Sequence, residues 1–268
     1  MKKYILFFVC AILFCSCHQS KTDIVKDYVD VLNCYDKEKM SQYLSDSFMF
    51  YGVGIQLNKF EYLDRVDVVK AIEQKTTILE TQDLDSIVSA EEKWSTIIDS
   101  LLEVTPKVVQ KISYRFSGNK LKSITIDTSL NYAEYKKSYD EKTSPCYFYL
   151  NSKYDIQDDW DFVRNAKQYI TEYANLPASD KNKYRVYAYL QGTFVSDDNP
   201  FYRKLVFKGK RTVSIVDAIF GLSFATSYEV DENYIRIRTD QSDLLFEVVD
   251  ENTLVGEGFA KGTFKKVN

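Results

Sequence analysis

The chain has 268 residues, enough for one large domain or two of ordinary size. Its 35 Lys and Arg residues face 39 Asp and Glu residues, and the net charge of −4 argues against nucleic acid as a partner, because nucleic-acid binding needs a basic patch. The single histidine is His18, so the chain beyond it lacks the imidazole of Ser-His or Cys-His catalysis and of nearly all zinc sites. No phosphate-binding glycine loop, dinucleotide fingerprint or haem-attachment motif is present, and we expect no cofactor.

The N-terminus has the pattern of an export signal. Lys2 and Lys3 precede the apolar run YILFFVCAILF at residues 4–14. This run is shorter than the roughly 20 residues that a membrane-spanning helix needs. The next residues resemble the box that ends a lipoprotein signal, because FCSC at residues 14–17 has an apolar residue, two smallish residues and a cysteine, with Phe14 in place of the usual leucine.

The lipoprotein resemblance implies that Cys17 carries the lipid and that residues 1–16 are removed as a signal peptide. Cys15 as the acceptor would place Phe14 next to the cut, where a small residue is expected, so Cys17 is favoured. Acyl chains such as palmitate on its sulfur and its new amino group would anchor the protein stably, since two chains suffice for this. We expect outer-membrane attachment, with the periplasmic side favoured over the cell surface. The alternative, a Cys-x-Cys-His metal or redox site, would have to lie within a secretion signal.

Two further cysteines, Cys34 and Cys146, belong to the body of the protein. In an oxidising compartment they could form a disulfide, and they are equally consistent with two buried thiols. Among the acidic pairs, Asp197 and Asp198 come nearest to a calcium loop. The loop lacks spaced ligands and a glycine, so we interpret it as a solvated turn and expect no metal site.

The first part of the body begins with predicted helices. Residues 24–33 place their apolar side chains on one helical face, and Asp36 can cap a short second helix. Asn58 followed by Glu61 has the spacing of a capping box, and apolar residues at helical spacing continue from there to Ile72.

Predicted strands alternate with these helices. Residues 45–54 and the stretch 86–93 have strand-like patterns, and a short helical insert follows and ends at Pro106. The clearest hairpin pairs residues 107–116 with residues 121–127 across the turn SGNK.

The stretch DYVDVLNCYDKEKMSQYLSDSFMFYG resembles the opening of the ketosteroid-isomerase-like, or nuclear-transport-factor-like, superfamily. The spacing that carries the resemblance belongs to Tyr28, Asn33, Asp36, Leu44, Phe48 and Phe50. The resemblance covers about residues 22–128 and implies an α+β fold in which a cone-shaped antiparallel sheet wraps a helix. The alternative is an unrelated α+β domain with the same element order.

The second part of the body reads as helices and then strands. Residues 129–180 predict a helical extension and linker after the domain at residues 17–128. Residues 181–268 predict an all-β meander of six to eight antiparallel strands, an open sheet or a small barrel, whose first strand is expected at residues 184–194. This last part loosely resembles lipocalin-like domains of bacterial lipoproteins.

The family resemblance implies a cavity between the sheet and the helices. Its candidate lining residues are Tyr28, Phe48, Phe50, Trp94, Tyr114 and Phe116, which equally suit a plain core. Asp127 and Tyr114 are the nearest candidates for proton transfer, because burial raises a carboxyl pKa and a tyrosine can donate to an enolate. Neither matches a catalytic position of the family. The 21 tyrosines and two tryptophans are spread along the chain, which favours packing over sugar stacking.

These patterns together favour a lipid-anchored envelope protein with a non-catalytic role in binding a small apolar ligand or another envelope protein. Its membrane partner would be reached through Cys17. One alternative is a small lyase or isomerase of the cyclase type that uses Asp and Tyr. Another is a structural subunit of an envelope complex.

Overall fold

The computed structural model describes residues 19–154, 159–240 and 242–267. The predicted signal peptide and the proposed lipid acceptor Cys17 lie outside these residues. The chain forms two compact units, the first from residues 1–97 and 106–135, the second from residues 98–105 and 136–268. Among the described helices, none combines the length and the apolar character needed to span a bilayer.

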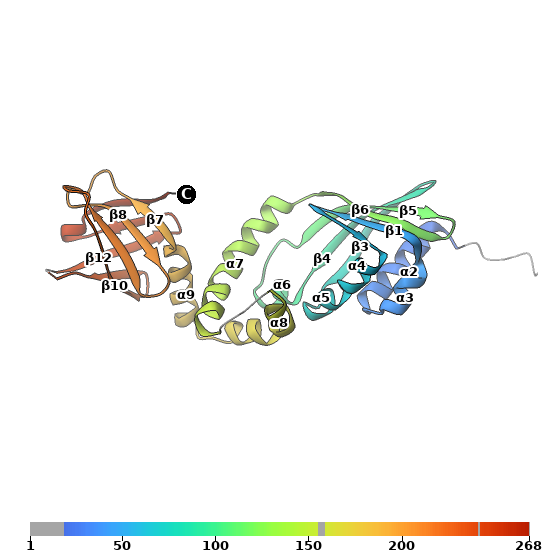
Figure 1. The fold of residues 1–268 in the computed structure, drawn as a ribbon, viewed down its shortest axis with the longest axis horizontal. Coiled ribbons are helices and arrows are strands. Elements are labelled where there is room, and N and C mark those ends of the chain that lie inside the picture. The colour runs from blue at the N-terminus through green and yellow to red at the C-terminus, as the bar shows by residue number, and fades with distance from the viewer. Residues whose placement is uncertain (1–18, 155–158, 241, 268) are drawn as a thin grey trace, which may run out of the picture. The chain divides into compact units, whose positions relative to one another are not determined.

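The first unit is a curved six-stranded sheet with helices packed on one face (Figure 1). The strand order is β2-β1-β6-β5-β4-β3, and neighbouring strands are antiparallel except for β1 and β6, which are parallel. This confirms the expected α+β class. The elements are α2 (Lys21–Asn33), α3 (Lys37–Tyr43), β1 (Leu44–Gly52), β2 (Ile55–Asn58), α4 (Lys59–Asp64), α5 (Val66–Ala71), β3 (Lys75–Leu84), β4 (Ile87–Ser95), β5 (Val108–Ser117) and β6 (Lys120–Ser129).

The helix starts predicted from the sequence are confirmed. The Asp36 side chain accepts a hydrogen bond from the backbone N–H of Lys39 at 3.0 Å and caps α3. Asn58 and Glu61 form the reciprocal capping box at the start of α4, with distances of 3.1 and 2.9 Å. The helical spacing that continued to Ile72 is divided between α4 and α5.

The predicted hairpin is β5–β6, in which Tyr114 pairs with Ile124 and Ile112 with Ile126. The edge strand β3 was not predicted, because most of its side chains are exposed and its sequence, KTTILETQDL, is rich in polar residues. The amide of Asn33 at the end of α2 fixes this strand. It donates to the Thr76 carbonyl and accepts from the Thr76 N–H, both at 2.8 Å.

The second unit begins with helices and ends with a barrel. The helices are α6 (Ile97–Leu101), α7 (Tyr132–Lys153), α8 (Asp159–Ala174) and α9 (Ala178–Leu190). We expected a strand at residues 184–194, but residues 184–190 belong to helix α9, and the strand begins at Gly192. Val186, Tyr187 and Leu190 have helical spacing, and α9 buries this face in the core of the barrel.

Eight strands close into a barrel in the order β10-β11-β12-β13-β14-β7-β8-β9, which confirms the all-β prediction for the C-terminal part. Every neighbouring pair is antiparallel, and alternate side chains fill the interior. The strands are β7 (Gly192–Val195), β8 (Tyr202–Lys208), β9 (Thr212–Asp217), β10 (Ser223–Asp231), β11 (Tyr234–Arg238), β12 (Asp243–Asp250), β13 (Thr253–Gly256) and β14 (Gly262–Val267).

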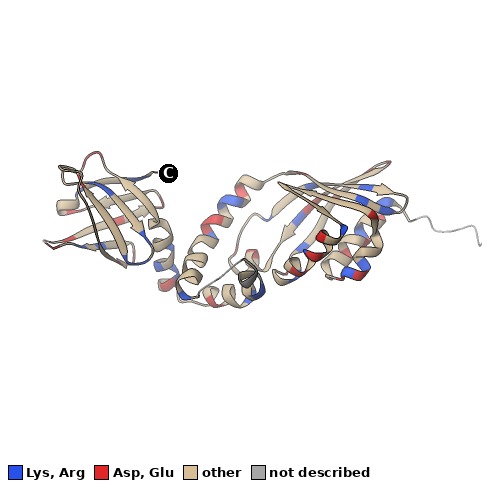
Figure 2. Cartoon of the chain, viewed as in Figure 1, with Lys and Arg blue, Asp and Glu red and all other residues tan. Residues whose placement is uncertain are grey.

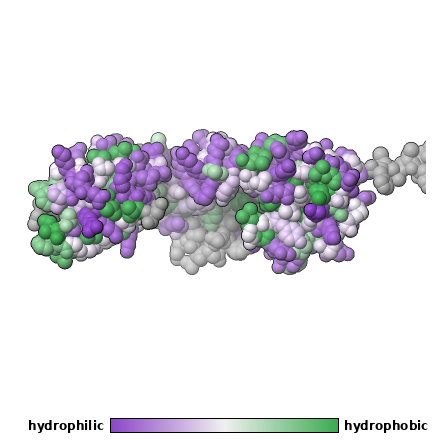
Figure 3. Space-filling view, turned by 90° about the horizontal axis from the view of Figure 1, so that it is seen from above, coloured by the Kyte–Doolittle hydropathy of each residue, from purple (hydrophilic) through white to green (hydrophobic). Residues whose placement is uncertain are grey.

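One end of the barrel exposes large apolar side chains, and a hydrophobic area is visible at the barrel in Figure 3. The loop between β9 and β10 presents Ile219, Phe220 and Leu222 there. The carboxylate of Asp217 holds this loop by accepting hydrogen bonds from the backbone N–H groups of all three residues, at 2.5 to 3.0 Å. These bonds also hold the pKa of Asp217 below its usual value.

Candidate functional site

The structure brings the six predicted aromatic residues of the first unit into one cluster. Tyr28, Phe48 and Tyr114 are buried, and their side chains pack between the helices and the sheet. The other three, Phe50, Trp94 and Phe116, are partly buried against the same cluster. The rings of Tyr28 and Tyr114 meet edge-on with their centroids 6.3 Å apart, and aliphatic side chains complete the same core.

Asp127 does not belong to this cluster. It is exposed and accepts a hydrogen bond from the Ser113 hydroxyl at 2.6 Å. Neighbouring residues in a strand point to opposite faces, and Ser113 precedes the buried Tyr114. Asp127 therefore lies on the face of the sheet that points away from the interior. The prediction that it acts beside Tyr114 in the interior is wrong.

The carboxylate inside the cluster is Glu92, which sequence reasoning missed. Its side chain is 2% exposed and comes from β4 on the same face as Val88 and Ala90. The Tyr114 hydroxyl donates to Glu92 Oε1, and the Trp94 indole N–H donates to Oε2 at 3.1 Å. Burial raises the pKa of Glu92 above its usual value, and the two donors oppose this shift.

A second pair of buried hydroxyl groups lies in the same interior. The hydroxyl oxygens of Tyr28 and Tyr62 are 2.6 Å apart and share one hydrogen bond. The ring of Tyr62 stacks on Phe50 with centroids 5.1 Å apart. Burial raises the pKa of Tyr62 to about 12 and that of Tyr28 well above its usual value. Both phenols are therefore neutral in the folded protein at ordinary pH.

The interior holds one further polar group that lacks a partner. Gln110 on β5 lies directly opposite Glu92 in the strand register. Its side-chain N–H donates to the Ser129 hydroxyl at 3.2 Å, whereas its buried Oε1 has no hydrogen-bond partner in the structure. Such an orphaned acceptor is unusual in a folded protein.

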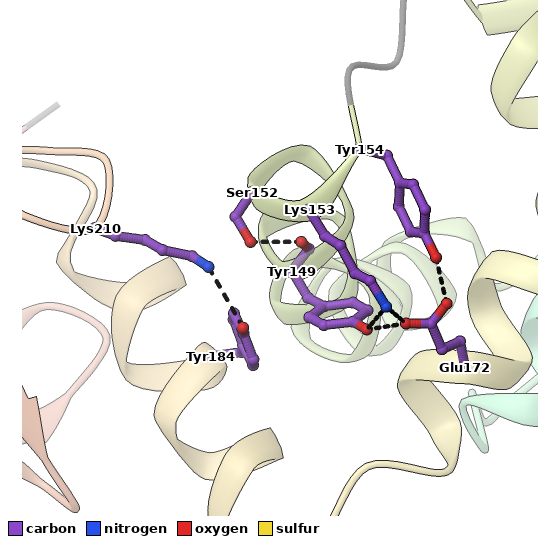
Figure 4. Close-up of polar contacts among 7 residues, drawn as sticks. All are labelled: Tyr149, Ser152, Lys153, Tyr154, Glu172, Tyr184 and Lys210. Atoms are coloured by element: carbon purple, nitrogen blue, oxygen red, sulfur yellow. Dashed lines mark hydrogen bonds and ion pairs between the residues drawn. The ribbon is translucent and has the colours of Figure 1, made fainter.

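The helices of the second unit carry a polar cluster around Glu172 of α8. Tyr149 and Lys153 of α7, and Tyr154 directly after this helix, all donate to this carboxylate, as Figure 4 shows. These donors lower the pKa of Glu172 to about 2, with Lys153 as the largest cause. Both oxygens of the carboxylate therefore accept hydrogen bonds that join α8 to the C-terminal end of α7.

An open cleft of about 830 Å³ lies beside this cluster. We call it the tyrosine cleft, because Tyr149, Tyr184, Tyr187 and Tyr228 line it from α7, α9 and β10. Its charged lining residues are Lys183, Lys210, Arg211, Asp180 and Glu229. Figure 4 shows Lys210 directed at the Tyr184 hydroxyl, with its Nζ 3.4 Å from that oxygen.

A second open cleft of about 680 Å³ lies between α7, α9 and the edges of β12 and β14. Its walls carry both signs of charge, and Lys, Arg, Asp and Glu residues lie along both helices in Figure 2. Lys266 donates to the Tyr189 carbonyl at 2.8 Å within it. Burial lowers the pKa of Lys266 below its usual value.

Neither remaining cysteine forms a bond in the structure. Cys34 follows α2 and is exposed, and Cys146 is buried in α7. The alternatives were a disulfide or two buried thiols. The structure has two separate thiols, of which Cys34 is exposed and Cys146 is buried. Burial raises the pKa of Cys146 to about 12, which keeps it an inert thiol. In the part of the chain that the structure describes, no group of three or more His, Cys, Asp and Glu side chains could hold a metal ion.

Comparisons with known proteins find similar folds among solved structures. An NTF2-like protein from Cytophaga hutchinsonii has 11% sequence identity and a TM-score of 0.35, over 42% of this chain and 93% of that one. A protein with a ketosteroid-isomerase-like fold from Catenulispora acidiphila, bound to trimethylamine, has 13% identity and a TM-score of 0.35, over 41% and 87%. A cystatin-fold protein from Novosphingobium aromaticivorans has 15% identity and a TM-score of 0.35, over 41% and 98%. No protein-family model matches the chain, and no curated protein matches it.

Proposed function

We propose that the protein is a lipid-anchored component of the cell envelope that binds a ligand or a partner and catalyses no reaction. The observation that carries the proposal is the tyrosine cleft, which is open to solvent and lined by aromatic and cationic side chains. By contrast, Glu92 in the interior of the first unit is closed off from solvent, because it is buried and both of its oxygens accept hydrogen bonds from the protein.

The binding role is tested by a native mass spectrum of the full chain, purified in detergent from its own host. The spectrum is repeated after denaturation and organic extraction. An additional mass that is lost on extraction supports the proposal, and so does the mass of a bound partner protein. A bare chain contradicts the proposal, and a clean multiple of the chain favours the structural-subunit alternative instead.

The anchor rests on the sequence and needs its own test. Cys17→Ala should abolish labelling by a palmitate analogue and leave the signal peptide uncut. Cys15→Ala is the matched control and should be labelled and processed normally. Labelling that survives Cys17→Ala but is lost in Cys15→Ala would move the acceptor to Cys15. Labelling that is lost in neither variant would refute an anchor at either cysteine.

A second candidate function is proton transfer by Glu92 and Tyr114, in place of the predicted Asp127. The specific observations in its favour are the raised pKa of Glu92 and the unpartnered Oε1 of Gln110 opposite it. The molecule extracted above would be incubated with the protein in D2O. Deuterium uptake at carbon with the wild type, but not with Glu92→Gln, would support this function, and no uptake would contradict it.

A further inference from the structure

The wall of the tyrosine cleft is a continuous row of aromatic rings from three elements. The ring of Tyr149 meets Tyr184 edge-on with centroids 4.9 Å apart. Tyr187 continues the row to Tyr228 of the barrel, with centroids 6.0 Å apart. Tyr187 and Tyr228 are buried, whereas Tyr184 is only half-buried. The row is therefore held rigid by the core, and Tyr184 is its accessible member.

The charged groups of the cleft give it a positive character in an acidic protein. Lys210 lies over the ring of Tyr184, with Nζ 4.7 Å from the centroid, and Arg211 follows it in the turn between β8 and β9. Of the two acids in the lining, Glu229 forms an ion pair with Arg238 at 2.6 Å. Within the described residues, no ion pair is found for Lys210 or Arg211. These two cations are available to an anion.

The size and the openness of the cleft indicate a hydrophilic ligand. Its volume of about 830 Å³ is within the usual range of roughly 300–1,000 Å³ for ligand sites, but such sites for apolar ligands are enclosed and mostly hydrophobic. Here the tyrosines offer apolar ring faces together with polar hydroxyl groups. A pyranose ring has the matching surface, because its C–H groups pack on an aromatic face and its hydroxyl groups project from the rim.

The geometry points to the tyrosine cleft as a binding site for an acidic oligosaccharide, an inference that rests on the proposed binding function. A sugar ring packs against the exposed part of the Tyr184 side chain, and a uronate carboxylate binds Lys210 and Arg211. This ligand class replaces the small apolar ligand expected from the sequence. It also gives a few of the 21 tyrosines a role in sugar stacking, although most of them pack.

The test is a calorimetric titration of the full chain in detergent with α-1,4-trigalacturonate. Maltotriose supplies the same kind of linked pyranose rings without charge, and sodium sulfate supplies charge without a ring. The double variant Lys210→Gln/Arg211→Gln and the single variant Tyr184→Ala should each weaken trigalacturonate binding by about tenfold or more. Tyr184→Phe keeps the ring and should bind within about twofold of the wild type. Lys208→Gln, an exposed lysine near the same turn but outside the cleft, should bind equally well.

Trigalacturonate binding that depends on Tyr184 and on the two cations would support the inference. Equal affinity for maltotriose would overturn it, because the cations would then play no part. Equal affinity for sulfate would overturn it as well, by reducing the cleft to a simple anion site. If none of the three binds, the ligand class is wrong, and the mass lost on extraction separately decides whether the proposed binding function also fails.

Discussion

Tyr114 donates a hydrogen bond to Glu92 across the neighbouring strands β5 and β4, inside a core of aromatic and aliphatic side chains. The Trp94 indole is a second donor to this carboxylate. The two hydrogen bonds compensate its desolvation only in part, because its pKa stays raised. A buried acid of this kind costs stability in its charged form, and the cost must appear in the pH dependence of unfolding.

The first prediction concerns Glu92→Gln. Because the folded-state pKa of Glu92 is raised, the folded state binds more protons than the unfolded state above about pH 4.5. The free energy of unfolding therefore falls as the pH rises through that window. Glu92→Gln removes this slope, because an amide does not titrate in this range. The variant should keep the local structure, since its amide can accept from Trp94 and donate to the Tyr114 oxygen. Urea unfolding between pH 4 and 8 measures the slope. Glu91→Gln, on the neighbouring position of the strand, should keep it, and a wild-type slope in Glu92→Gln would contradict the assignment.

The second prediction concerns Tyr114→Phe, which removes the donor to Glu92 Oε1 and leaves the ring in place. A buried acceptor without its donor costs about 1–3 kcal/mol of the free energy of unfolding. Chemical denaturation at pH 7 measures the loss. Tyr132→Phe, at an exposed position at the start of α7, should change it by less than about 0.5 kcal/mol. Equal losses in the two variants would show that the hydrogen bond contributes nothing.

Some parts of the first unit follow from local sequence chemistry. The capping residues Asp36 and Asn58 and the hairpin turn SGNK work within a few residues, so pattern alone predicted their elements. The family resemblance predicts the six aromatic residues as the lining of a cavity, whereas the structure packs them into one core cluster, which is the alternative that the sequence left open. Glu92 stands directly after Glu91 in the sequence, but a period of two from Val88 and Ala90 places Glu92 on the inner face and Glu91 on the outer one. The same alternation places Asp127 on the outer face. Counting strand positions from the buried neighbours therefore predicts Glu92, and not Asp127, as the carboxylate inside the first unit.

The second unit shows what the sequence could not supply. The tyrosine cleft combines residues of α7, α9 and β10 that are up to 81 positions apart, from Tyr149 to Val230, and only the fold brings them together. The residues 184–190 illustrate a local error. Their aromatic and β-branched side chains favour a strand, but burial of Val186, Tyr187 and Leu190 against the barrel favours a helix, and packing decides.

The third prediction concerns Glu172, which accepts hydrogen bonds from Lys153 and two tyrosines (Figure 4). Its folded-state pKa of about 2 lies below the ordinary value. The stabilisation is therefore fully present above about pH 4.5 and is lost as the pH falls towards 2. Glu172→Gln should lower the melting temperature at pH 7 and flatten its fall in acid, because the amide attracts Lys153 less. The exposed Glu141→Gln should leave both unchanged. An unaltered acid profile in Glu172→Gln would remove the cluster from the causes of acid unfolding.

The fourth prediction concerns Asn199, a buried amide that joins two loops at the apolar end of the barrel. Its Nδ2 donates to the carbonyls of Phe259 and Lys261, at 3.2 and 3.0 Å. Its Oδ1 accepts from the N–H groups of Phe201 and Tyr202, at 2.8 and 2.6 Å. Asn199→Ala leaves these backbone groups unpaired and should cost about 3 kcal/mol of the free energy of unfolding.

The isosteric variant Asn199→Asp separates the donating half of this amide from the accepting half. A carboxylate still accepts from Phe201 and Tyr202, so hydrogen exchange at these two amides should stay slow, whereas Asn199→Ala should accelerate it. The carboxylate also faces two carbonyl oxygens, which raises its pKa, so Asn199→Asp should be unstable at pH 7 and recover as the pH falls and the acid can donate. Asn252→Ala, in an exposed turn, is the matched control and should change neither measurement. Fast exchange at Phe201 and Tyr202 in Asn199→Asp would mean that the donated bonds alone hold the two loops together.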